Sequence, residues 1–135
     1  MARADRTQFL DGYVLPAIRV EIGGPRLSLG VDPGAAVTVL PSWVADDLGL
    51  NRTHPVRWLQ LAGVGVSPPI PVVRVPRMVV AGADVGPLEA CVYDLPAVLR
   101  VDGLIGLDVL RRFRVTSEFD TRSLVLRPHG VRVRS

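Results

Sequence analysis

The sequence predicts a single, mostly β domain with one or two short helices. Short apolar runs, several of them alternating with polar residues, are separated by frequent turn formers, with 13 Gly and 12 Pro among 135 residues. At 48% hydrophobic residues, a chain of this length can bury a substantial core in one domain. We expect this core to span about residues 14–128, with tails at residues 1–10 and 129–135.

Two early strands are expected at residues 17–22 and 26–32, where apolar and polar side chains alternate. In the second strand the two leucines and Val31 would share one face. This alternation predicts that Asp32 emerges at the end of the strand, on the side away from the core.

The rest of the chain continues this pattern. Pro41 and Gly49 are suited to begin and end a short helix. A loop with Gly, Ser and Pro over residues 63–69 is expected to join two long strands as a mobile cover. The expected strands are residues 35–40, 56–66, 71–82, 103–106, 114–120 and 123–128, and the expected helices are residues 41–50 and 107–113.

Composition excludes several classes of function. The 16 basic residues are all arginine, so a phosphate-binding loop with its lysine is absent, and the net charge of +3 demands no nucleic acid. No apolar run reaches the roughly 18 residues of a membrane span, and the polar N-terminus predicts a cytoplasmic protein. The single Cys91 and the two isolated histidines predict a buried thiol, no metal site and no cofactor.

One carboxylate stands out in the stretch VDPGAAVTVLP, residues 31–41. Asp32-Pro33-Gly34 has the sequence of a type II turn, with proline setting φ and glycine supplying the positive φ that follows. The same carboxylate, at the end of a strand, is also a candidate catalytic group. The tripeptide alone does not decide between these interpretations.

An ordered set of motifs resembles the retropepsin-like aspartic protease family, in particular its small bacterial and retroelement-type members. The set comprises Asp32-x-Gly34-Ala35, the following VTVLP…LGL, the segment LAGVGV, and the pair DGLIGLDVL…F and EFDTRSLVL. It covers about residues 14–128.

The resemblance implies a closed β-barrel domain with a catalytic loop beneath a flap. Asp32 would be the catalytic residue, and Pro33, Gly34 and Ala35 would complete the loop. The flap would contain Gly63, Val64 and Gly65, and Ile105 and Gly106 would cross near the loop and support it.

This chemistry needs two carboxylates that share one proton, and the chain offers one Asp-x-Gly of this kind. The resemblance therefore implies a homodimer that cleaves a peptide or protein substrate, with one aspartate from each subunit. Pro33 departs from the family, whose members carry Thr or Ser there, and it removes a hydroxyl that would hydrogen-bond across the dimer.

Three hypotheses follow. The first is a homodimeric aspartic endopeptidase. The second keeps the fold without the activity, as a peptide-binding or dimerisation module, because of Pro33. The third is an unrelated small β domain in which Asp-Pro-Gly is only a turn.

Overall fold

The computed structural model describes residues 5–8, 16–60, 68–129 and 132–133 and confirms a mostly β chain with few helices. The helices are α1 (Ser42–Asp47), α2 (Leu107–Leu110) and the 3₁₀ helix η1 (Ala97–Leu99). The strands are β1 (Asp5–Gln8), β2 (Ala17–Glu21), β3 (Arg26–Val31), β4 (Val39–Leu40), β5 (Arg57–Leu59), β6 (Ile70–Val75), β7 (Val79–Val80), β8 (Ala83–Asp84), β9 (Leu88–Val92), β10 (Gly103–Ile105), β11 (Phe113–Glu118), β12 (Ser123–Pro128) and β13 (Arg132–Val133).

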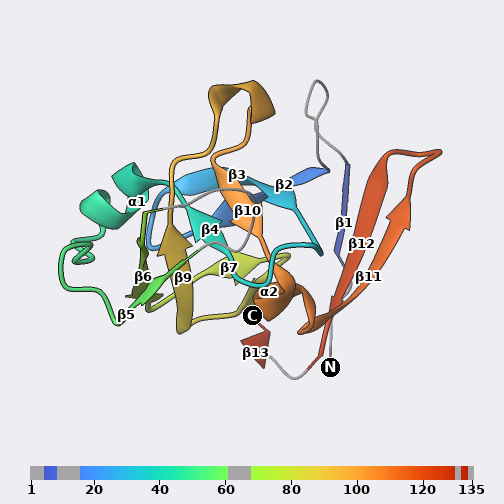
Figure 1. Ribbon diagram of the computed structural model, residues 1–135. Helices are drawn as coiled ribbons and strands as arrows, with labels where there is room; N and C mark the ends of the chain where they lie inside the picture. The colour runs from blue at the N-terminus through green and yellow to red at the C-terminus, as the bar shows by residue number, and fades with distance from the viewer. Residues whose placement is uncertain (1–4, 9–15, 61–67, 130–131, 134–135) are drawn as a thin grey trace.

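The described strands form two sheets. Ten of them pair in the order β13-β8-β7-β2-β3-β10-β4-β9-β6-β5, and three pair in the order β1-β12-β11. The β11–β12 hairpin extends away from the larger sheet on the right of Figure 1. Short strands thus form inside both predicted tails.

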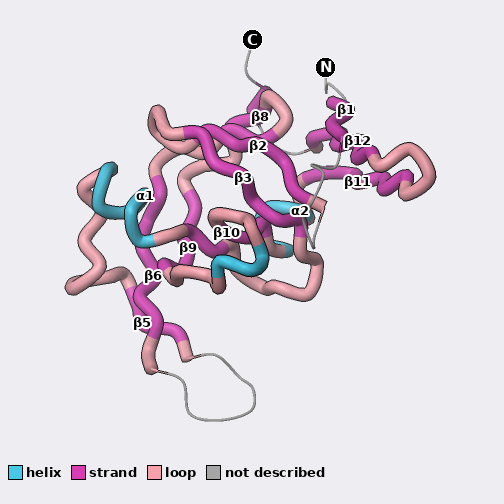
Figure 2. The backbone as a smooth tube through the Cα atoms, turned by 90° about the horizontal axis from the view of Figure 1, so that it is seen from above, coloured by secondary structure: helices cyan, strands magenta, loops and turns pink. Residues whose placement is uncertain are grey.

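The closed barrel is not confirmed. Within the described residues the larger sheet is open, because β13 and β5 at its two ends each have one strand neighbour. β5 pairs with the start of β6, and this pair projects from the body of the molecule (Figure 2). The predicted flap residues Gly63, Val64 and Gly65 lie outside the described residues.

β10 lies between β3 and β4 and holds the centre of the sheet together. It runs parallel to β3, with Ile105 opposite Val31, and antiparallel to β4, with Leu104 opposite Val39. A Cβ atom on Gly103 would lie 2.1 Å from the Val39 carbonyl oxygen. Glycine is therefore required for β10 to approach β4 this closely.

β3 is buried on both faces, so the expectation of one core face and one outer face was wrong. Ser28 is buried along with the apolar residues of the strand. The Ser28 N–H donates to the Asp102 carboxylate at 2.9 Å, and the Asp102 N–H donates to the Ser28 carbonyl at 2.8 Å. The segment that leads into β10 therefore bonds to the edge of β3 that pairs with β10.

Several elements are shorter than predicted. Of the expected strand 35–40, only Val39–Leu40 pairs as β4, and the helices end after six and four residues. The expected strand 71–82 divides into β6 and β7 around Pro76, which cannot donate a backbone hydrogen bond.

Asp94, two residues after the end of β9, hydrogen-bonds to the first residue of α1. The Asp94 carboxylate accepts hydrogen bonds from the Ser42 N–H at 2.8 Å and from the Ser42 hydroxyl at 2.7 Å. Both bonds lower the pKa of Asp94 below its usual value, and the bond from the Ser42 backbone N–H has the larger effect. They also satisfy a donor in the first turn of the helix, which has no cap from Pro41.

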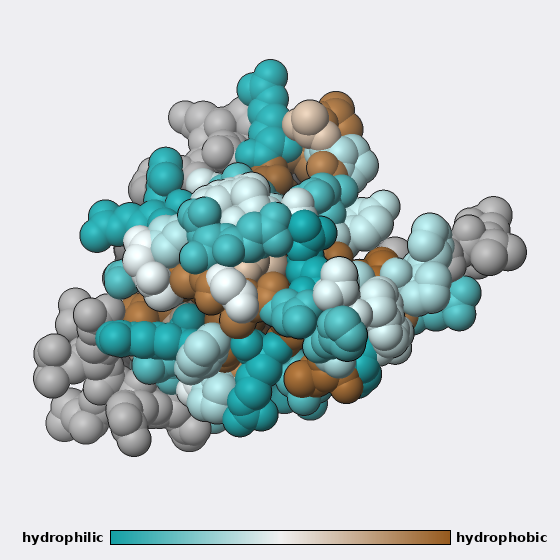
Figure 3. All heavy atoms as spheres, turned by 90° about the vertical axis from the view of Figure 1, so that its left-hand side faces the viewer, coloured by the Kyte–Doolittle hydropathy of each residue, from teal (hydrophilic) through white to brown (hydrophobic). Residues whose placement is uncertain are grey.

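The side of the molecule that carries α1 and β5 is mostly polar, with hydrophobic residues visible between the polar ones (Figure 3). Among the described residues, no helix has the length and apolar character needed to cross a membrane.

The apolar core has two parts. The larger cluster is built from most strands of the main sheet together with both α-helices and the β11–β12 hairpin. A smaller one consists of Ile70, Val72 and Cys91. Cys91 is buried, which confirms the prediction of a buried thiol, and this burial raises the pKa of the thiol.

Candidate active site

Asp32 begins a tight turn directly after β3. Its N–H donates to the Ile105 carbonyl at 3.0 Å, and its own carbonyl accepts from the Ala35 N–H at 3.1 Å. One carboxylate oxygen of Asp32 accepts the Gly34 N–H at 2.9 Å. The Asp32 residue is partly exposed, and the bond from the Gly34 N–H orients its carboxylate at the surface of the chain.

The turn is not of type II, and that prediction was wrong. Gly34 is not among the glycines with positive φ in the described residues, which are Gly23, Gly24, Gly49 and Gly82. A type II turn requires positive φ at this position. The glycine instead has a steric role, because a Cβ on Gly34 would lie 3.1 Å from Oδ1 of Asp32 and would crowd the carboxylate.

Ile105 and Gly106 lie against this turn. The Leu107 N–H donates to the Ala35 carbonyl at 2.8 Å. Leu107 lies two residues after Ile105, whose carbonyl accepts the Asp32 N–H. A Cβ on Gly106 would lie 2.7 Å from the Ala35 carbonyl oxygen. The chain at residues 105–107 therefore bonds to both ends of the Asp32–Ala35 turn, and only a glycine at position 106 leaves room for this contact.

Thr38 and Asp108 form a polar link that the sequence analysis missed. The Thr38 hydroxyl donates to Oδ1 of Asp108 at 2.8 Å, and the Thr38 N–H donates to Oδ2 at 3.0 Å. Oδ1 also accepts the Val109 N–H at 2.9 Å, and the Thr38 hydroxyl oxygen accepts the Gly106 N–H at 3.3 Å. This network ties the segment after the turn to the first turn of α2.

A sequence signal for this link did exist. Thr38 is fully buried and is a polar residue within an apolar run, as Asp108 is within its own. Since buried polar groups need hydrogen-bond partners, two such residues are candidates for each other.

Pro33 lies beside an apolar surface. It helps to line a pocket of about 270 Å³ whose other apolar members are Val31, Leu107, Leu110, Phe113 and Val115. Leu107 is 38% exposed although it begins α2. The proline ring therefore extends an apolar patch next to the Asp32 carboxylate.

The described residues contain no cluster of His, Cys, Asp and Glu that could hold a metal ion. The groups hydrogen-bonded to Asp32 are backbone groups of Gly34, Ala35 and Ile105.

The sequence matches a known family. A family model described as "Aspartyl protease" matches residues 18–109. The chain is 34% identical over 115 residues to the UBA domain-containing protein Mud1 of Schizosaccharomyces pombe, a match that covers 84% of this chain. It covers 32% of Mud1, so the chain spans about a third of the length of this curated relative.

Solved structures share the fold. A retropepsin-like aspartic protease from Rickettsia conorii superposes with a TM-score of 0.73 at 16% identity, covering 95% of this chain and 92% of that one. The retroviral protease-like domain of Ddi1 from Leishmania major gives a TM-score of 0.59 at 24% identity, covering 88% of this chain and 93% of that domain. The fold is therefore retropepsin-like, as the sequence motifs predicted.

The Thr38 hydroxyl can be tested directly. Thr38→Val keeps the shape of the side chain but removes the hydroxyl that donates to Oδ1 of Asp108 and leaves the buried Gly106 N–H without its acceptor, so we expect it to lower the free energy of unfolding by about 2 kcal/mol. Thr38→Ser keeps the hydroxyl and is the matched control, with a smaller loss. Urea unfolding measures both, and a loss for Thr38→Val no larger than the loss for Thr38→Ser would contradict the role given to the hydroxyl.

Proposed function

Because this chain belongs to the aspartyl protease family, we propose that it hydrolyses peptide bonds as a homodimer, with Asp32 as the catalytic residue of each subunit. The observation that supports this proposal is the position of Asp32, a partly exposed carboxylate in a turn bonded to Ile105 and Leu107. Such rigid support is what a catalytic group requires.

Two copies of the chain would supply the pair of carboxylates that the reaction needs. Two carboxylates in close contact cannot both ionise readily, so they share a proton. The ionised one takes a proton from water, whose oxygen attacks the peptide carbonyl carbon, while the protonated one donates to the carbonyl oxygen. Collapse of the tetrahedral intermediate breaks the C–N bond, and the amine leaves with a proton.

The hydrogen bonds of Asp32 suit such an arrangement. Within the described part of the chain its carboxylate accepts one hydrogen bond, from Gly34 to Oδ1. Oδ2 is thus available for a water or for the second aspartate. In this proposal Gly34 and Ala35 shape the loop, Ile105 and Gly106 support it, and Gly63, Val64 and Gly65 cover the bound peptide.

The apolar patch beside Asp32 favours a second copy of the chain as the neighbour. Pro33 and Leu107 are both exposed on this side of the turn. A twofold axis near Asp32 would bring the two copies of this patch close together, because a twofold interface uses the same surface on both subunits. Burying these side chains would stabilise the dimer that catalysis needs.

Substitution of the aspartate tests the activity. We expect Asp32→Asn to abolish hydrolysis of denatured casein at acid pH while fold and dimer persist, because the amide is nearly isosteric but cannot share a proton. Asp47→Asn, which changes an exposed carboxylate on α1, is the matched control and should keep full activity. Residual hydrolysis by Asp32→Asn would assign the activity to another group or to a contaminant.

A second candidate function is a peptide-binding or dimerisation module without activity. Pro33 favours it, because proline supplies neither the hydroxyl nor the N–H that Thr or Ser would offer beneath the aspartates. This candidate keeps the same fold and the same dimer. It differs from the first only in the absence of hydrolysis.

Pro33→Thr separates the two candidates. If the chain is an active peptidase, the new hydroxyl should tighten the dimer by about 1 kcal/mol for each hydrogen bond formed and should raise the turnover of casein. For a module without activity, the dimer tightens and no hydrolysis appears. Pro33→Ala removes the ring without adding a hydroxyl and is the control.

Sedimentation equilibrium measures the dimer in both variants. A Pro33→Thr protein that dimerises less than the wild type would show that the fixed φ and the apolar ring of proline organise the loop. The interpretation of Pro33 as a lost hydroxyl would then be wrong.

A further inference from the structure

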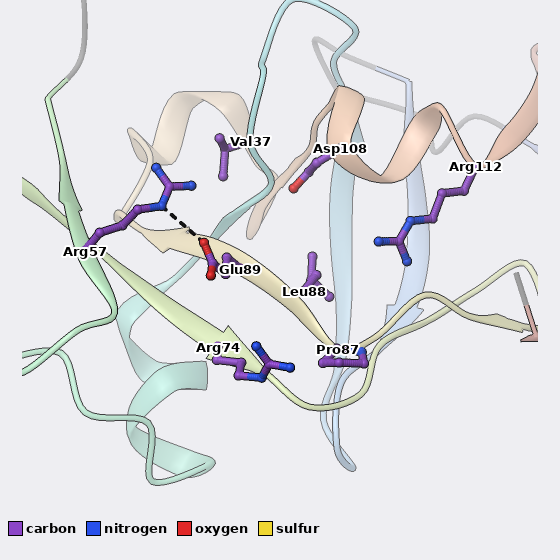
Figure 4. A pocket seen from close by; sticks show the side chains of 8 residues that line it. All are labelled: Val37, Arg57, Arg74, Pro87, Leu88, Glu89, Asp108 and Arg112. Atoms are coloured by element: carbon purple, nitrogen blue, oxygen red, sulfur yellow. Dashed lines mark hydrogen bonds and ion pairs between the residues drawn. The ribbon is translucent and has the colours of Figure 1, made fainter. Parts of the chain in front are cut away.

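A charged pocket of about 370 Å³ has Asp108 of the Thr38–Asp108 link among its lining residues (Figure 4). Its walls come from the segment after the Asp32 turn, from β5, β6 and β9, and from the end of α2. The residues that line it are Val37, Arg57, Arg74, Pro87, Leu88, Glu89, Asp108 and Arg112. Asp32 is not among them, and Val37 and Asp108 belong to segments that follow the Asp32 turn and support it.

Two of the three arginines are already engaged. The Nε of Arg57 forms an ion pair with Glu89 at 3.2 Å. Arg112 donates a short hydrogen bond to the Val85 carbonyl. Arg74 stands opposite Glu89 in the β6–β9 ladder and has no hydrogen bond or ion pair within the described residues.

The two carboxylates do not cancel this positive charge. Three guanidinium groups against Glu89 and Asp108 leave one positive charge in the pocket. The Asp108 carboxylate is held by donors from Thr38 and Val109, so it faces the arginines with its oxygens already bonded. A ligand with a single negative charge would balance the pocket, whereas a doubly charged phosphate would also be repelled by the two carboxylates.

The position of the pocket relative to the Asp32 turn indicates which molecule could carry the negatively charged group. Val37 lines the pocket and lies five residues after Asp32 in the chain, and its neighbour Thr38 is bonded to Asp108, which also lines the pocket. An extended peptide rises about 3.3 Å per residue, so its residues several positions from the cleaved bond extend beyond the Asp32 turn. A peptide held at Asp32 could therefore place a distal side chain in the pocket.

We propose that this arginine pocket binds the carboxylate of an acidic side chain on a peptide held at the Asp32 site. The proposal rests on the proposed function for its peptide and adds a preference for Glu or Asp at a distance from the cleaved bond. Arg74 supplies the free guanidinium, whose planar donors match a carboxylate in a bidentate geometry. Arg57 and Arg112 add charge, and Leu88 and Val37 receive the apolar part of the side chain.

Binding is tested with acetyl-Glu-Glu-Glu-Glu-amide, followed by NMR of the arginine Nε–H signals. We expect shifts confined to Arg57, Arg74 and Arg112, and binding about tenfold weaker in Arg74→Gln. Arg114→Gln, which changes an exposed arginine on β11, is the matched control and should bind as the wild type does. This measurement needs no hydrolysis, so it fails or succeeds independently of the proposed activity.

Three outcomes would overturn the proposal. The first is equal binding of acetyl-Gln-Gln-Gln-Gln-amide, and the second is a set of shifts spread over arginines throughout the chain. The third is stronger binding of inorganic phosphate, which would assign the pocket to a different anion.

The effect of the arginine pocket on cleavage preference can be measured separately. Peptides released from casein by the wild type, identified by mass spectrometry, should show an acidic residue at a fixed distance from the cleaved bond. Arg74→Gln should lose this preference. Cleavage without any acidic preference would overturn the inference and leave the proposed activity standing.

Discussion

The passage of β10 between β3 and β4 is the constraint on which the candidate site depends. β3 delivers Asp32 and β4 takes up the chain after the turn, so a strand between them fixes both ends of the turn at once. The approach is possible because Gly103 and Gly106 have no side chain where β10 meets the neighbouring backbone. This arrangement suits the catalytic role proposed for Asp32, since backbone hydrogen bonds set the position of its carboxylate.

The Thr38–Asp108 network extends this constraint toward α2. The buried Thr38 hydroxyl and the Asp108 carboxylate, which accepts three hydrogen bonds, hold the segment after the turn in one place. Residues of α2 belong to two surfaces of different character. Leu107 and Leu110 line the apolar pocket with Pro33, and Asp108 lines the arginine pocket. In the proposed dimer, the apolar surface would meet a second subunit and the arginine pocket would meet the substrate.

The sequence predicted the features that depend on local pattern or on ordered motifs. The mostly β chain, the retropepsin-like fold and the burial of Cys91 are confirmed. The features that it missed depend on contacts distant in sequence. Alternation assigned one outer face to β3 because nothing local shows that both faces of this strand are covered, and the Asp-Pro-Gly turn was misassigned because Gly34 has no positive φ and is instead close to the Asp32 carboxylate.

The central claim is that one active site is shared by two chains, and hybrid dimers test it most directly. Wild-type protein is mixed with Asp32→Asn, the subunits are allowed to exchange, and casein hydrolysis is measured per wild-type chain. If each site needs an aspartate from both subunits, this activity falls to about half in an equimolar mixture, because about half of the wild-type chains are then paired with the variant. Activity per wild-type chain that stays constant at every mixing ratio would show that a single chain carries a complete site and would contradict the account.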